Sequence, residues 1–185
     1  MIKKIIFSFF ILFHTSVFAE DILTVGTYDS FAADWGPGPN IEDGFEKICN
    51  CDLQFIATSQ AGSLSSDIFV KGKDVILGVE HNDFDTSYND NLWAFYDYGY
   101  FAFIYDNSKL NNPPKSMDDL VNRNDLKIVV QDPRTSPVGM GLLRWMKSIF
   151  GDEYQYKMNK FDKNVVTYTP GWTEAYGMFL EGNAD

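Results

Sequence analysis

Strand-like segments alternate with helix-like segments along most of this 185-residue chain, and this alternation constrains the fold more than any other feature. Apolar residues at alternate or consecutive positions predict short strands over 23–27, 51–57 and 74–77. Between the first two strands, apolar residues at i, i+4 and i+7 from Ile41 predict a helix, and a weaker helix is expected over 59–69. Strand, helix and strand in succession favour right-handed βαβ units and a mostly parallel sheet.

The alternation resumes in the second half, after two segments of a different kind. Residues 81–91 read as a polar loop, and residues 92–105 are dense in aromatic side chains and give the strongest strand signal of the chain. The later elements are expected to be a helix over 116–121, a strand over 127–130, a helix over 136–150, a strand over 165–169 and a helix over 173–182. We therefore expect an α/β fold with two lobes, over 20–96 and 101–185, joined by a crossover strand with a hinge at 97–100.

Residues 1–19 have the pattern of a secretory signal peptide. Lys3 and Lys4 precede an apolar stretch over 5–13, and the segment ends in the small residue Ala19. The apolar stretch is too short to cross a bilayer, which leaves an uncleaved interfacial anchor as the alternative. We expect export to the periplasm, with no transmembrane segment later in the chain.

The composition narrows the possible partners. A formal net charge of -11 argues against nucleic acid and anionic membrane surfaces as partners. Such a balance would suit a cationic ligand, although a solvated acidic surface is the commoner reason for it. An aromatic fraction of 16% indicates a globular chain rather than a disordered one.

Cys49 and Cys51 are the only cysteines of the chain, in the order Cys-Asn-Cys. An oxidising periplasm favours a disulfide between them, whereas the small size of the ring favours a reducible bridge or none. With His81 as the only histidine after the signal peptide, too few ligands remain for a zinc site. A cysteine pair at a helix end without any catalytic role is the simpler interpretation.

The loop after the first strand carries the first candidate site. Tyr28, Asp29 and Trp35 lie where ligands bind in open α/β sheets, beyond the carboxyl end of a strand. Aromatic and acidic groups together could hold a flat cationic ring by stacking and cation–π attraction. The alternative is that Trp35 packs under the loop of glycines and prolines.

Two later strand ends repeat this arrangement. Thr135 and Ser136 precede a helix whose free backbone N–H groups could bind a phosphate or carboxylate; alternatively Ser136 is only an N-cap. Arg134 could pair with Asp132 instead of facing a ligand. Trp172 begins the last helix and could offer a stacking surface, or it could pack against its own helix.

The aromatic segment allows a further alternative. Tyr96 and Asp97, with the tyrosines that follow, could supply hard oxygen ligands to Fe(III), whereas a crossover strand packed on both faces explains the same residues without a metal. Gly99 is either a hinge or a bulge. Neither a phosphate-binding glycine loop nor a nucleophile elbow is present in the sequence.

Four blocks resemble the thiamine-binding periplasmic proteins, the substrate-binding components of thiamine ABC importers. The specific motifs are DWGPGP at 34–39 and DYGYFAF at 97–103, and the blocks occur in the order of the family at 23–39, 49–51, 97–114 and 131–146 with 171–177. The resemblance implies a type II-like periplasmic binding fold of two α/β lobes that binds thiamine, thiamine monophosphate or thiamine diphosphate. It also implies delivery to an ABC permease of the inner membrane, without catalysis and without a cofactor.

The resemblance also implies roles for individual residues. Tyr28 and Trp35 would line the thiamine site from the first lobe, Ser136 would meet the phosphate of thiamine phosphates, and Trp172 would lie beside it. Gln60 stands where an acidic residue near the ring is expected. The full set of candidate ligand-binding residues is Tyr28, Asp29, Trp35, Gln60, Asp97, Thr135, Ser136 and Trp172.

This chain departs from the family pattern in length. The helix after Ser66 and the stretch between Gly78 and Leu92 are shorter than in the family, and the family continues beyond Asp185 with a strand that completes the first lobe. We therefore expect an incomplete first lobe and a truncated copy with weak thiamine binding or none. The alternatives are an inert fragment, a ferric-iron or polyamine binder of the same fold, and a thiamine-cleaving enzyme with a cysteine nucleophile.

Overall fold

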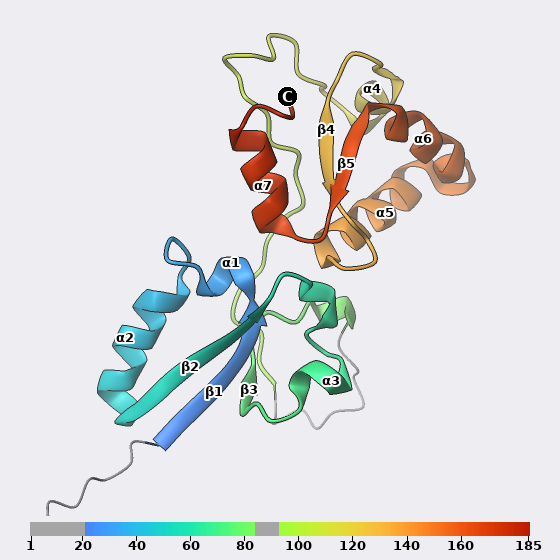
Figure 1. Cartoon of the computed structure of the whole chain (residues 1–185). Coiled ribbons are helices and arrows are strands. Elements are labelled where there is room, and N and C mark those ends of the chain that lie inside the picture. Colours follow the sequence, from blue (N-terminus) through green and yellow to red (C-terminus); the bar gives the residue numbers. More distant parts are fainter. Residues whose placement is uncertain (1–20, 84–92) are drawn as a thin grey trace, which may run out of the picture.

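Two groups of helices and strands, each built on a small parallel sheet, make up the computed structural model, which describes residues 21–83 and 93–185 (Figure 1). The α/β class expected from the sequence is confirmed. The expected signal peptide and most of the expected polar loop over 81–91 lie outside the described residues. Within the described ranges, no helix combines the length and the apolar character needed to cross a membrane.

The first sheet has the strand order β2-β1-β3, and both pairs of strands are parallel. Its strands are β1 (Asp21–Tyr28), β2 (Cys51–Thr58) and β3 (Val75–Ile76). β1 and β2 run in register from Asp21 opposite Cys51 to Tyr28 opposite Thr58. All three strands were expected, and we call this sheet with its helices the first lobe.

The helices of the first lobe are α1 (Asp29–Ala32), α2 (Gly38–Cys49) and α3 (Asp67–Val70), with single 3-10 turns at Ala61–Ser63 and His81–Asp83. The sequence predicted α2 but not α1. In place of the weak helix predicted over 59–69, the structure has a 3-10 turn and the short helix α3. The apolar side of α2 is poorly covered, since Ile48 is 83% exposed. Among residues 21–83, the buried apolar side chains are few: Val25, Phe31, Leu53 and Leu64.

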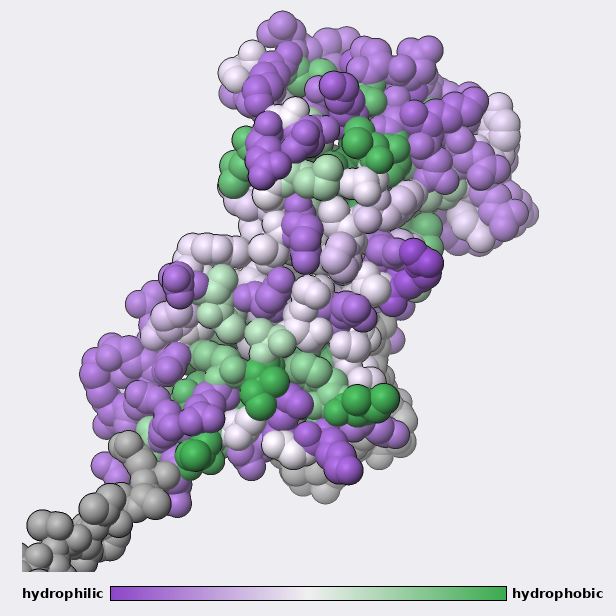
Figure 2. All heavy atoms as spheres, in the orientation of Figure 1, coloured by the Kyte–Doolittle hydropathy of each residue, from purple (hydrophilic) through white to green (hydrophobic). Residues whose placement is uncertain are grey.

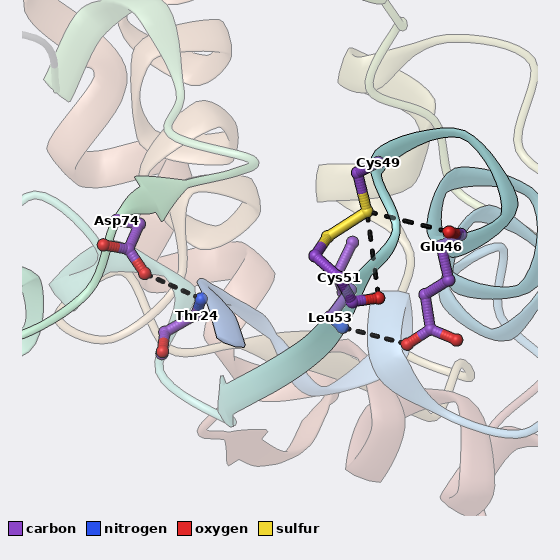
Figure 3. Close-up of a disulfide and its surroundings, with 6 residues drawn as sticks. All are labelled: Thr24, Glu46, Cys49, Cys51, Leu53 and Asp74. Carbon is purple, nitrogen blue, oxygen red and sulfur yellow. Dashed lines mark hydrogen bonds between the residues drawn. A yellow bond between two sulfur atoms is a disulfide. The ribbon is translucent and has the colours of Figure 1, made fainter. Parts of the chain in front are cut away.

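A disulfide between Cys49 and Cys51 closes the connection from α2 to β2 (Figure 3). Asn50 between them has a φ of 54° and caps α2 in the left-handed conformation. Glu46 of α2 accepts a hydrogen bond from the backbone N–H of Leu53 at 2.9 Å. These contacts fix the angle between helix and strand at the amino end of β2.

The second sheet pairs β4 (Ile128–Gln131) with β5 (Val165–Thr169) in parallel. Around it lie α4 (Met117–Asn122), α5 (Pro137–Phe150), α6 (Tyr154–Phe161) and α7 (Trp172–Leu180), with 3-10 turns at Gly151–Glu153 and Asp162–Asn164. The main hydrophobic core lies here, and Val121, Met146 and Phe161 are at most 1% exposed. We call this group the second lobe; only α6 and the two turns were not expected.

The prediction of a strand over 92–105 is wrong. Residues 93–106 have no regular secondary structure, and Tyr98 and Tyr100 are 88% and 91% exposed instead of packed on both faces. The physical reason is the lack of a partner: among the described residues, no strand lies beside this segment to pair with its backbone. The boundaries at 20–96, 97–100 and 101–185 remain predictions.

Candidate functional site

Loops that follow strand ends in the two lobes meet between them (Figure 1). The backbone N–H of Gly62 in the first lobe donates to the carbonyl of Thr135 in the second at 2.9 Å. Gly171, which precedes α7, lies so close to the first lobe that a Cβ there would come within 2.4 Å of the Ser59 carbonyl oxygen. This meeting point is where ligands bind in open α/β folds.

Trp35 and Trp172 come from different lobes and touch here. Their ring centroids are 5.5 Å apart with the planes tilted by 41°, and Trp172 also stacks on Tyr176 at 4.5 Å. Trp35 is 61% exposed, so it does not pack under its own loop. The three rings form an accessible aromatic surface, which we call the aromatic site. Tyr176 was missed by the sequence interpretation, although its position four residues after Trp172 places both rings on one side of a helix.

Ser136 at the start of α5 is fully engaged within the protein. Its Oγ accepts from the backbone N–H of Val138 at 3.2 Å and donates to Oε1 of Gln131 at 2.6 Å, and the residue is 4% exposed. Thr135 Oγ1 donates to the Pro170 carbonyl at 2.8 Å. Ser136 is therefore the N-cap of α5, and both hydroxyl groups would have to turn to reach a phosphate.

Arg134 pairs with Asp132, which is one of the two arrangements that the sequence left open. The guanidinium Nε lies 2.9 and 3.0 Å from the two carboxylate oxygens, and the backbone N–H of Arg134 also donates to Asp132 at 2.8 Å. Hydrogen bonds from the Arg134 side chain and backbone lower the pKa of Asp132 to about 2. The pair fixes the turn that leads into α5.

Tyr28, Tyr96 and Asp97 interact beside the end of β1. Burial raises the pKa of Tyr28, and the negative charge of Asp97 adds to this, while a hydrogen bond with Tyr96 acts in the opposite direction. Burial is also the largest cause that raises the pKa of Tyr96, followed by the charges of Tyr28 and Asp97. Both shifts favour the neutral phenol.

Gly78 makes room for the Tyr28 ring. Its φ is +88°, and a Cβ there would lie 2.4 Å from the Tyr28 ring. Gly78, Tyr96 and Asp97 line the same cavity as Trp172 and Tyr176, which connects the aromatic site to these tyrosines.

The remaining candidate residues lie near this region without a contact to the aromatic site. Asp29 accepts a hydrogen bond from the backbone N–H of Ser30 at 2.7 Å, at the start of α1. Gln60 is exposed, and its backbone N–H donates to Oγ1 of Thr58 at 3.1 Å. Among residues 21–83 and 93–185, no cluster of three or more His, Cys, Asp or Glu side chains could hold a metal ion.

The cysteines lie at the other end of the first sheet. Cys51 begins β2, whereas the aromatic site lies beyond the ends of the strands, and both sulfur atoms are in the disulfide. The part of the chain that the structure describes therefore holds no free thiol. A thiamine-cleaving enzyme with a cysteine nucleophile is not favoured.

These features define an α/β protein with a candidate small-molecule site between two parallel sheets. The chain is 41% identical to the thiamine-binding periplasmic protein of Escherichia coli (strain K12), with all of this chain and 64% of that protein covered. It is 36% identical to the protein of the same name from Haemophilus influenzae, over 94% of this chain and 61% of that protein. A solved periplasmic thiamin binding protein matches with a TM-score of 0.81 and 41% identity, over 90% of this chain and 60% of its own.

The resemblance seen in the sequence is confirmed: the chain is a relative of the thiamine-binding periplasmic proteins. It spans just under two thirds of the length of the curated relatives it matches. The alignment with the Escherichia coli protein extends over 211 residues, more than the 185 of this chain, which fits the expected internal shortening. No protein-family model matches the chain.

Proposed function

We propose that this chain is a periplasmic solute-binding protein that captures thiamine or thiamine phosphates between its two lobes, without catalysing a reaction. The observation that carries the proposal is the contact between Trp35 and Trp172, one from each lobe, at 5.5 Å. A flat cationic ring bound against this aromatic surface gains both stacking and cation–π attraction. Its relatives are named as thiamine-binding and periplasmic.

The remaining candidate residues have distinct parts in this proposal. Tyr28, held by Tyr96 and Gly78, would line the site from the first lobe, with the carboxylates of Asp29 and Asp97 near a positive ring. Ser136 and Thr135 would meet the phosphate of a thiamine phosphate at the start of α5, where the helix dipole favours an anion. Their present hydrogen bonds would be exchanged for bonds to the ligand.

We further propose the type II-like arrangement of two lobes, with a first lobe smaller than in the relatives. The exposed apolar side of α2 and the short list of buried side chains in this lobe support the second point. Gln60 stands where the family pattern has an acidic residue. Weaker binding than in the longer relatives is therefore expected, and an ABC permease of the inner membrane would be the partner.

Calorimetric titration of the purified chain with thiamine, thiamine monophosphate and thiamine diphosphate tests the proposal. The substitution Trp172→Ala should weaken binding about five- to thirtyfold, since stacking with a cation contributes about 1–2 kcal/mol. Tyr156→Ala is the matched control, because Tyr156 is an exposed aromatic side chain on α6, away from the aromatic site. It should leave binding unchanged.

A thermal melt of the same samples separates a folded chain that does not bind thiamine from a chain that is not folded. A ligand that binds only the native state must raise the melting temperature. A chain that melts cooperatively, yet gives neither heat of binding nor a shifted midpoint with excess thiamine, would contradict the proposal.

A further inference from the structure

The start of α5 is the expected binding place of a ligand phosphate, yet its backbone donors are already in use. The N–H groups of Thr135 and Ser136 both donate to the Asp132 carbonyl, at 3.1 and 2.8 Å. The Val138 N–H donates to Ser136 Oγ at 3.2 Å, and Pro137, the first residue of the helix, has no N–H. Because a helix N-terminus binds an anion through free N–H groups, the start of α5 offers few donors to a phosphate.

The hydroxyl groups at this place are engaged as well, and they lie outside the cavity between the lobes. Ser136 Oγ donates to Gln131 Oε1 at 2.6 Å, and Thr135 Oγ1 donates to the Pro170 carbonyl at 2.8 Å. Gln131 and Val138 line the cavity, whereas Thr135 and Ser136 do not. A ligand in the cavity therefore meets the Gln131 side chain and not the Ser136 hydroxyl that Gln131 holds.

Gly139 brings the first turn of α5 directly onto the backbone that precedes it. Gly139 is buried, and a Cβ there would lie 2.2 Å from the Gln131 carbonyl oxygen and 2.7 Å from the Pro133 nitrogen. Only a residue without a side chain allows this close approach. No room is left for a phosphate group between the first turn of the helix and residues 131–133.

The charges around this loop do not favour a phosphate either. Arg134 is the one cationic residue of the sequence over 131–136, and its guanidinium is paired with the Asp132 carboxylate. The Gly62 N–H of the first lobe is bonded to the Thr135 carbonyl at 2.9 Å. Where the lobes meet, the face shown in Figure 2 carries mostly side chains of intermediate hydropathy. A phosphate monoester carries a charge of about -1.5 to -2 at pH 7, and burying it without free donors or a free cation costs free energy.

We propose that this site selects free thiamine over thiamine phosphates, and that Gln131 and Pro137 set the preference. The proposed selectivity rests on the proposed function and narrows its ligand. Gln131 holds the Ser136 hydroxyl outside the cavity, and Pro137 removes one N–H from the first turn of α5. Thiamine ends in a neutral hydroxyl group where its phosphates carry their negative charge, so only the phosphates need the donors that are engaged here.

Calorimetric titration of the full chain with thiamine and with thiamine monophosphate measures the ratio of the two dissociation constants. The monophosphate should bind at least about tenfold more weakly, since one missing hydrogen bond to a charged group corresponds to about ten- to hundredfold in affinity. Gln131→Ala frees the Ser136 hydroxyl and Pro137→Ala adds an N–H, so each should lower the ratio at least about threefold. Gln155→Ala is the matched control, because Gln155 is an exposed glutamine on α6, and it should leave the ratio unchanged.

Both constants of a ratio come from the same variant, so a general loss of stability cancels and the ratio reports specificity. Tight binding of thiamine with equal or tighter binding of the monophosphate would overturn the proposed selectivity alone. A preference for thiamine that neither Gln131→Ala nor Pro137→Ala reduces would overturn the roles given to these two residues. Binding of neither ligand by a chain that melts cooperatively would overturn the proposed function, and the selectivity with it.

Discussion

Two buried threonines differ in whether the side-chain hydroxyl has a hydrogen-bond partner. Replacing each by valine should therefore have different effects on stability. Thr27 in β1 is fully buried, and its Oγ1 has no hydrogen-bond partner among the described residues. Thr169 in β5 is also buried, but its Oγ1 donates to the Gly171 carbonyl at 3.0 Å. Burying a polar group without a partner costs free energy, whereas a bonded one is a net gain.

Thr27→Val should therefore leave the free energy of unfolding unchanged or raise it by about 1 kcal/mol, while Thr169→Val should lower it by about 1–2 kcal/mol. Urea unfolding of both variants, followed by circular dichroism, measures the difference. Equal losses in the two variants would mean that the Thr27 hydroxyl has a role that the structure does not reveal.

The pairing of Asp132 with Arg134 predicts a specific dependence of stability on pH. Because hydrogen bonds from Arg134 lower the pKa of Asp132 in the folded protein to about 2, the folded state is favoured wherever this carboxyl is ionised. This contribution is complete above the ordinary pKa of about 4 and is lost as the pH falls towards 2. Asp132→Asn should lower the melting temperature at pH 7, and the gap to the original chain should close between pH 4 and pH 2.

Thermal melts across this pH range test the expectation. Asp152→Asn is the control, since Asp152 is an exposed carboxylate in the turn between α5 and α6. A gap between Asp132→Asn and the original chain that stays constant down to pH 2 would disprove the assigned pKa.

At the scale of an element, α4 depends on its N-cap. Ser116 Oγ accepts from the backbone N–H of Asp119 at 3.1 Å, and the Asp119 carboxylate accepts from the Lys115 N–H at 3.0 Å. This resembles a capping box shifted by one residue. Ser116→Ala should cost about 1 kcal/mol of stability in chemical unfolding. Ser148→Ala, on the exposed side of α5, should be neutral or slightly stabilising, so equal losses at both sites would refute the cap.

The same capping signal explains why most elements were predictable from the sequence. Local sequence patterns show where a helix begins: Ser116 and Ser136 are the N-caps of α4 and α5. Local apolar patterns likewise show where the strands lie. The segment over 93–106 was not predictable, because a strand needs neighbours and sequence propensity carries no information about them. α6 was missed because only Phe161 of this helix is buried, which leaves a weak apolar period.

The candidate site was predictable to a similar degree. The loops that hold Trp35 and Trp172 follow from the positions of strand ends, and the structure brings both rings together. Individual side-chain hydrogen bonds could not be predicted in this way. The donation from Ser136 to Gln131 and the interaction of Tyr28 with Tyr96 depend on how the chain packs, which local patterns do not specify.

The two lobes have separate hydrophobic cores and, within the part of the chain that the structure describes, meet through few contacts. The main core belongs entirely to the second lobe, and the first lobe has its own small group around Val25 and Leu53. Between them lie the Gly62–Thr135 hydrogen bond and the Trp35–Trp172 contact. Since cooperativity requires shared buried surface, we expect the lobes to unfold independently.

Met146 and Leu53, each buried in one core, test this expectation in the full chain. Met146→Ala should remove about 2–5 kcal/mol from the second lobe, because a cavity forms at a fully buried position. Hydrogen exchange in low urea should then accelerate in peptides from α4 to β5, while β1 and β2 keep their rates. Leu53→Ala should do the reverse. If either substitution accelerates exchange equally in both lobes, the chain unfolds as one cooperative unit, and the inter-lobe contacts contribute far more than their number suggests.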